Sequence, residues 1–120
     1  MLAVGEHVLG RREPTWIPMA SGLGGGVGGS QQEMCGALSG GVLVLGCLFG
    51  PAGAGEDRQF VSDRVAQYRE RFAERFGATR CAPLRQRIEA ESWLPGCDVL
   101  VEHATEELLT FLAEVEPELD

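Results

Sequence analysis

The chain has 120 residues, of which 44% are hydrophobic, and this size and composition indicate one small globular domain spanning residues 1–120. Its 18 acidic and 10 basic residues give a net charge of −8, which argues against binding to nucleic acid or to anionic membranes. The basic residues are all arginine, so the chain lacks the lysine of a Walker phosphate loop and any lysine that could form a Schiff base.

Helices are expected along the whole chain, because apolar residues recur at helical spacing and no segment alternates as a strand would. Glycine-rich residues 22–29 should form a loop, and residues 51–56 a linker. The sequence predicts an all-α fold, a small bundle of about five helices around a glycine-rich central helix. The expected helices cover residues 1–10, 15–21, 33–49 and 58–76, roughly ten residues from Cys81 or Ala82, and a last segment from Cys97 or Asp98.

The central helix belongs to a stretch without charge, residues 34–55, that is long enough to raise the question of a membrane span. Its many glycines and the break before Pro51 indicate instead a helix that its neighbours bury on every side. The N-terminus has no basic region followed by an apolar one, so no secretion signal is expected. We predict no membrane span and a cytoplasmic location.

Two other helices are expected to have one apolar face each. Arg and Glu residues at 69–75 should form a solvated, salt-bridged face opposite the first of these, and Gly77 should end that helix as a left-handed cap. The two apolar faces consist of Phe60, Val61, Val65, Tyr68, Phe72 and Phe76, and of Val101, Ala104, Leu108, Leu112 and Val115.

Cysteines stand at the expected starts of three helices. Cys35 opens the segment Cys-Gly-Ala-Leu-Ser-Gly directly after the glycine-rich loop, and Cys81 and Cys97 begin the last two helices. The positive end of a helix dipole favours thiolate over thiol, so these positions point to redox or metal chemistry. Neighbouring glycines allow backbone or a cofactor to approach closely. The candidate cofactor-binding residues are Gly24, Gly25, Gly26 and Gly36.

The glycine-rich loop with the CGAxxG segment 35–40, the segment Phe76-Gly-Ala-Thr-Arg-Cys81 and the segment Pro-Gly-Cys97 resemble the C-GCAxxG-C-C family of putative redox-active proteins. The resemblance extends from about residue 2 to about residue 112, and the combination of CGAxxG with both downstream cysteines is specific. It implies a redox-active or cofactor-binding role for Cys35, Cys81 and Cys97, and it supplies no reaction.

The family is described by four cysteines, and the resemblance places the first of them in a helix just upstream of Met1. Residues 1–9 look like the remaining half of that helix, so either the true start lies upstream or this lineage works with three thiols. Cys47 fills no family position. It follows Cys35 by 12 residues on one expected helix, an axial rise of about 18 Å that excludes a disulfide between them. We predict that Cys47 is a buried, small apolar residue.

Two kinds of site are open if Cys35, Cys81 and Cys97 converge. One is a thiol–disulfide couple. The other is an iron–sulfur cluster or another thiolate-bound metal, whose fourth ligand would be His7, water, a partner subunit or the missing cysteine. Both require sulfurs within about 4–8 Å of one another, and the clustered thiols should react faster than Cys47 with alkylating agents.

A second class of function is a non-catalytic helical dimer, an interaction module whose cysteines are buried and inert. We expect a homodimer in either class, because glycine-rich helix faces favour close packing, and the redox class adds an electron-transfer partner. The GxGxxG pattern of residues 24–29 follows no strand and therefore does not indicate a dinucleotide site. His103 is expected to be a surface or hydrogen-bonded residue.

Overall fold

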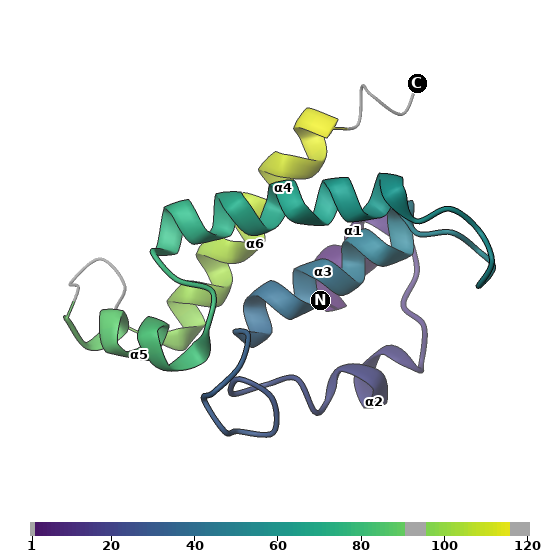
Figure 1. The fold of residues 1–120 in the computed structure, drawn as a ribbon. Helices are drawn as coiled ribbons and strands as arrows, with labels where there is room; N and C mark the ends of the chain where they lie inside the picture. The colour runs from purple at the N-terminus through teal and green to yellow at the C-terminus, as the bar shows by residue number, and fades with distance from the viewer. Residues whose placement is uncertain (1, 91–95, 116–120) are drawn as a thin grey trace.

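The computed structural model describes residues 2–90 and 96–115, and six helices joined by turns and loops make up this part of the chain (Figure 1). The prediction of an all-α fold is confirmed for the described residues, which contain no strand beyond an isolated bridge between Met34 and Arg80. No helix within these ranges is both long enough and apolar enough to cross a lipid bilayer. The helices are α1 (Leu2–Leu9), α2 (Trp16–Ala20), α3 (Gly36–Phe49), α4 (Gln59–Phe76), α5 (Cys81–Ala90) and α6 (Cys97–Val115).

The core forms where α3, α4 and α6 pack against one another (Figure 1). α4 contributes Tyr68, Phe72 and Phe76, whose side chains are fully buried. The ring centroids of Phe72 and Phe76 lie 4.7 Å apart, and those of Tyr68 and Phe111 of α6 lie 5.9 Å apart. Because aromatic side chains bury large apolar areas, this cluster joins α4 firmly to α6.

Two residues predicted for the apolar faces lie on the surface. Val101 is 51% exposed, because α6 turns Leu100 and Phe111 into the core and residue 101 lies about 100° further round the helix than residue 100. Phe60 is 42% exposed; it lies in the first turn of α4, where its ring contacts Phe49 with centroids 5.7 Å apart. The predicted helical spacing of apolar residues is correct in both helices, and the two errors are residues at the edge or the end of an apolar face.

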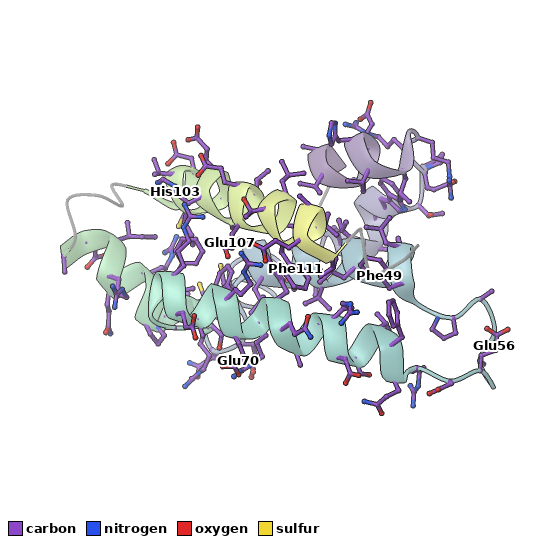
Figure 2. The ribbon with its side chains drawn as sticks, turned by 90° about the horizontal axis from the view of Figure 1, so that it is seen from above. Phe49, Glu56, Glu70, His103, Glu107 and Phe111 are labelled. Atoms are coloured by element: carbon purple, nitrogen blue, oxygen red, sulfur yellow. The ribbon has the colours of Figure 1, made fainter. Side chains whose placement is uncertain are left out.

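Arg71 and Arg75 depart from the solvated face predicted for α4, because both bind α6. Glu107 lies between them, with N–O distances of 2.8 Å to Arg71 and 3.0 Å to Arg75, and only 15% of its side chain is exposed. Figure 2 shows Glu107 on the side of α6 that faces α4, whereas Glu70 points away from α6. These ion pairs therefore fix the position of one helix against another.

α3 is buried all round in its first half, where residues 38–41 are all buried, but its second half is buried along one side only. Val44 and Leu45 face the core, and the next two residues, Gly46 and Cys47, turn to the opposite side and are exposed. The prediction that this helix is buried on every side therefore fails for its second half, and the prediction that Cys47 is buried is wrong. α3 also begins later than predicted, because residues 33–35 are extended and bind residues 79–81.

Gly41→Ala should destabilise the protein, because a Cβ at residue 41 would lie 2.7 Å from the Tyr68 ring and 3.1 Å from its hydroxyl oxygen. Overpacking of this kind costs about 1–3 kcal/mol. Gly46→Ala in the same helix is the matched control: its added Cβ has no atom within 4 Å. Alanine there should gain about 0.5–1 kcal/mol. Urea unfolding followed by circular dichroism measures both variants, and equal free energies of unfolding would contradict the packing of α3 against α4.

Candidate thiol site

A short antiparallel pairing of backbone holds the starts of α3 and α5 together. The Cys35 N–H donates to the Thr79 carbonyl oxygen at 2.8 Å, and the Cys81 N–H donates to the Glu33 carbonyl oxygen at 2.9 Å. Cys35 and Cys81 are therefore diagonal neighbours on one face of this pairing, a relation that places residues about 7–8 Å apart in regular sheets. The pairing brings together two cysteines that are far apart in the sequence.

The glycine-rich loop lies against this pairing. Residues 25–29 all have positive φ, and Gly26 has a φ of 71°. The Gly26 carbonyl oxygen accepts a hydrogen bond from the Glu33 N–H at 3.2 Å, which connects the loop to the paired segment. An added Cβ on Gly26 would lie 2.6 Å from the Cβ of Cys81, so the loop can contact Cys81 only because residue 26 is glycine.

Cys35, Cys81 and Cys97 line one pocket of about 420 Å³ at the starts of α3, α5 and α6. Cys35 and Cys81 are buried, with 9% and 7% of their surface exposed, whereas Cys97 is exposed. All four cysteines are free thiols, and Cys47 is not among the lining residues. The other residues that line the pocket are Ala20, Leu23, Gly24, Gly25, Gly36, Ala37, Gly40, Arg85, Leu100 and Val101.

The glycines predicted to bind a cofactor occupy two kinds of position. Gly24, Gly25 and Gly36 line the pocket, and an added Cβ on Gly36 would lie 3.4 Å from the Cα of Gly24. Gly26 packs against the Cβ of Cys81 and is not among the lining residues. Their role in cofactor binding stays a prediction.

Burial raises the pKa of the Cys35 thiol above its ordinary value of 9.0. Hydrogen bonds from the backbone of Ala37 and Leu38 lower this pKa, and the neighbouring thiols Cys81 and Cys97 raise it further. The sequence predicts a lowered pKa at this helix start. That prediction is wrong for Cys35, because the loss of solvent around its sulfur outweighs the stabilisation of a thiolate by the helix N–H groups.

Tyr68 gives Cys35 a neutral neighbour on the core side. Its hydroxyl donates to the Ala104 carbonyl oxygen at 3.4 Å, and burial first, then Glu107 and Cys35, raise its pKa far above the ordinary value of 10.0. The phenol therefore keeps its proton at physiological pH and adds no charge to the pocket.

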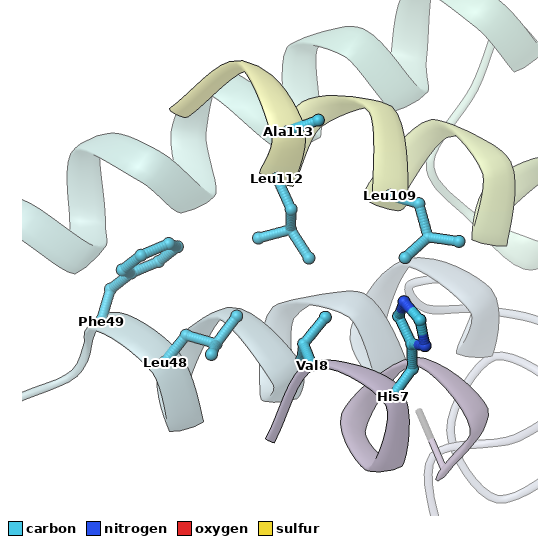
Figure 3. A pocket seen from close by; sticks show the side chains of 7 residues that line it. All are labelled: His7, Val8, Leu48, Phe49, Leu109, Leu112 and Ala113. Carbon is cyan, nitrogen blue, oxygen red and sulfur yellow. The ribbon is translucent and has the colours of Figure 1, made fainter. Parts of the chain in front are cut away.

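The described residues contain no group of three or more His, Cys, Asp or Glu side chains placed to hold a metal ion. His7, one candidate for a fourth ligand, instead lines a second pocket of about 520 Å³ at the opposite end of α3 (Figure 3). His7 is not among the described residues that line the thiol pocket. His103 binds the Arg75 guanidinium at 3.1 Å, in agreement with its expected role as a hydrogen-bonded surface residue.

Arg85 is the pocket residue that the sequence analysis missed. It lies four residues after Cys81 on α5, and both residues line the pocket. Residues with this spacing lie on the same face of a helix, one turn apart. The spacing could therefore have indicated Arg85 once Cys81 was recognised as a helix start.

A family model described as "Putative redox-active protein (C_GCAxxG_C_C)" matches residues 1–111. The chain belongs to this family. No curated protein and no solved structure matches the chain. The description of the C_GCAxxG_C_C family supports a redox-active role, and the three cysteines that the resemblance assigns to family positions are the ones that share the pocket.

Iodoacetamide should distinguish the four thiols of this C_GCAxxG_C_C protein. Cys47 and Cys97 are exposed and should be modified first. Cys35 and Cys81 should react more slowly by a factor on the order of ten or more, because both are shielded and Cys35 keeps its proton at neutral pH. Peptide mass spectrometry over time measures the four rates, and urea-unfolded protein is the control in which all four should react alike. Native Cys35 reacting as fast as Cys47 would contradict the burial described here.

The raised pKa of Cys35 should make stability fall at alkaline pH. The unfolded chain releases this proton near the ordinary pKa of 9.0, whereas the folded protein holds it to higher pH. The stabilisation is complete below the unfolded pKa and is lost as the pH rises from there through the folded pKa. Wild-type protein should therefore lose more free energy of unfolding than Cys35→Ala between about pH 8 and pH 10. Urea unfolding at each pH measures this difference. Cys47→Ala is the control and should follow the wild type; identical pH profiles for all three proteins would refute the assignment.

Proposed function

We propose that this C_GCAxxG_C_C protein is a thiol–disulfide redox protein, in which Cys97 reacts with a disulfide substrate and Cys35 or Cys81 completes the exchange. The proposal rests on one observation: three thiols from the starts of three helices line one pocket, and one of them is exposed. Thiol–disulfide exchange needs an accessible sulfur and a second sulfur nearby. The described geometry supports both requirements.

The first step uses the exposed thiol. The Cys97 sulfur, after losing its proton to solvent, attacks one sulfur of the substrate disulfide. The S–S bond of the substrate breaks, a mixed disulfide forms between Cys97 and one half of the substrate, and the other half leaves as a thiolate.

The second step uses a buried thiol. The sulfur of Cys35 or Cys81 attacks the Cys97 sulfur, so that the mixed disulfide breaks and a disulfide forms within the protein. The second half of the substrate leaves as a thiolate, which takes up the proton of the attacking thiol. The two protein thiols lose two electrons, and the substrate gains them. A dithiol reductant returns the protein to its starting state.

Burial suits Cys35 to the second step. Its raised pKa keeps the sulfur protonated while Cys97 is free, so Cys35 does not compete for reagents in the solvent. A mixed disulfide at Cys97 brings an electrophilic sulfur into the pocket, where Cys35 needs no further access to solvent.

An iron–sulfur cluster or another metal on Cys35, Cys81 and Cys97 is the other form of a redox site. The described Cys, His, Asp and Glu side chains are not placed as such a ligand set, so the proposal uses the thiols as an exchanging couple. A homodimer, an electron-transfer partner and a cytoplasmic location stay predictions that accompany the proposal.

Oxidation should produce one disulfide within the chain that includes Cys97. Reduced protein is treated with an equimolar small disulfide, the remaining thiols are blocked, and the peptides are mapped by mass spectrometry. We expect Cys97 joined to Cys35 or Cys81, two of the four thiols consumed, and full recovery of thiols with dithiothreitol.

Cys97→Ser and Cys47→Ser are the paired controls for this experiment, because both remove an exposed thiol. Cys97→Ser should abolish the disulfide within the chain, and Cys47→Ser should leave it unchanged. If Cys35 and Cys81 stay reduced in the native protein under every oxidising condition, the redox proposal fails and the interaction module with inert cysteines is favoured.

A further inference from the structure

The thiol pocket differs in charge from the rest of the molecule. The whole chain has a net charge of −8, with 18 acidic residues against 10 arginines. Among the described residues that line the pocket there is no Asp, Glu or His, and Arg85 is the only one that carries a charge. The charge that lines the described pocket is therefore positive, although the chain as a whole is negative.

Arg85 is also available to bind a ligand. It is exposed, and its guanidinium makes no hydrogen bond or ion pair with a described residue. Arg71 and Arg75 differ in this respect, because glutamates of α6 bind both of them. An arginine side chain presents planar, paired N–H donors that match the geometry of a carboxylate. Its location one helical turn from Cys81 places that group beside the thiols.

We propose that the pocket accepts a small anionic disulfide, and that Arg85 binds a carboxylate of this substrate while Cys97 attacks its S–S bond. This inference rests on the proposed redox function and adds the substrate class. The pocket volume of about 420 Å³ lies in the range of small-molecule sites, and a folded protein substrate would not enter it.

The carboxylate is not consumed in this reaction. Cys97 gives its proton to solvent and attacks the nearer sulfur of the bound disulfide, and the half that leaves departs as a thiolate carrying the electron pair of the broken S–S bond. The guanidinium of Arg85 keeps its charge throughout and holds the substrate in place. Without such a cation, the charge of the surrounding acidic protein would repel an anionic substrate.

The test compares three small disulfides of different charge in a Cys47→Ser background, which removes the exposed thiol outside the pocket. The probes are dithiobis-nitrobenzoate, which is dianionic, dithiodipyridine, which is neutral, and cystamine, which is dicationic. Stopped-flow absorbance and thiol mass spectrometry give the second-order rate constant at Cys97 for each probe.

Arg85→Glu should lower the rate constant for dithiobis-nitrobenzoate about tenfold or more relative to that for dithiodipyridine, and should raise the one for cystamine. Arg85→Lys keeps the charge and should retain most of the rate. High salt should reduce both the anion preference of the unmodified pocket and the cation preference of Arg85→Glu, because mobile ions screen each interaction.

Arg69→Glu is the matched control. It makes the same change in net charge on the exposed surface of α4, where Arg69 pairs only with Glu70 among the described residues. If Arg69→Glu and Arg85→Glu lower the anionic rate equally, the inference is overturned and the effect is one of total charge. If the disulfide within the chain still forms with the neutral probe but Arg85→Glu leaves all relative rates unchanged, the substrate class is wrong and the redox function stands. If Cys97→Ser leaves the rates unchanged, the redox function itself is overturned, and the inference with it.

Discussion

Two hydrogen bonds between backbone groups determine the arrangement of the thiol site. They join Cys35 to Thr79 and Cys81 to Glu33, and they hold the first residues of α3 and α5 side by side. Main-chain groups make this connection, so it places the two cysteines whatever the side chains around them contribute. The glycine-rich loop can then close over the pairing, because Gly26 leaves room for Cys81. α6 completes the pocket, because its first residue, Cys97, lines the same cavity.

The pocket combines thiols in two different environments. Helix starts favour thiolates, but this effect operates against the cost of removing a charge from water, and at Cys35 the cost of burial is larger. Cys97 shares the same type of position at a helix start and is exposed. In such a site the exposed Cys97 sulfur is accessible to a substrate, whereas the buried sulfurs of Cys35 and Cys81 would react only after the substrate is attached to Cys97.

The charge of the thiol pocket depends on which arginines form ion pairs with glutamates and which one does not. Arg71 and Arg75 neutralise Glu107 at the contact between α4 and α6, where the ion pairs are partly shielded from solvent and help to fix the angle of the two helices. Arg85 has no such partner among the described residues and faces the thiols instead. The chain has a net charge of −8, so the positive charge of Arg85 gives this cavity a charge opposite in sign to that of the whole protein.

The sequence alone determined the helices, the left-handed cap at Gly77, and the three cysteines that begin or precede a helix, because helical period, glycine and proline act over a few residues. The sequence motifs also indicated the family to which the chain belongs. The tertiary structure decided which faces are covered. Cys47 lies on the exposed side of the second half of α3. Cys35 belongs to the same uncharged stretch but is buried, because it precedes α3 in the segment that pairs with residues 79–81.

The pairing of residues 33–35 with 79–81 likewise has no local signal, since both segments are too short to show the alternation of a strand. The direction of the Cys35 pKa shift followed from that burial and not from the helix start, and Arg85 gained its significance only when Cys81 and Cys97 were found at the same cavity. Local sequence patterns specified the helices and the candidate thiols. Contacts between segments distant in the chain decided the solvent exposure and charge on which the chemistry of those thiols depends.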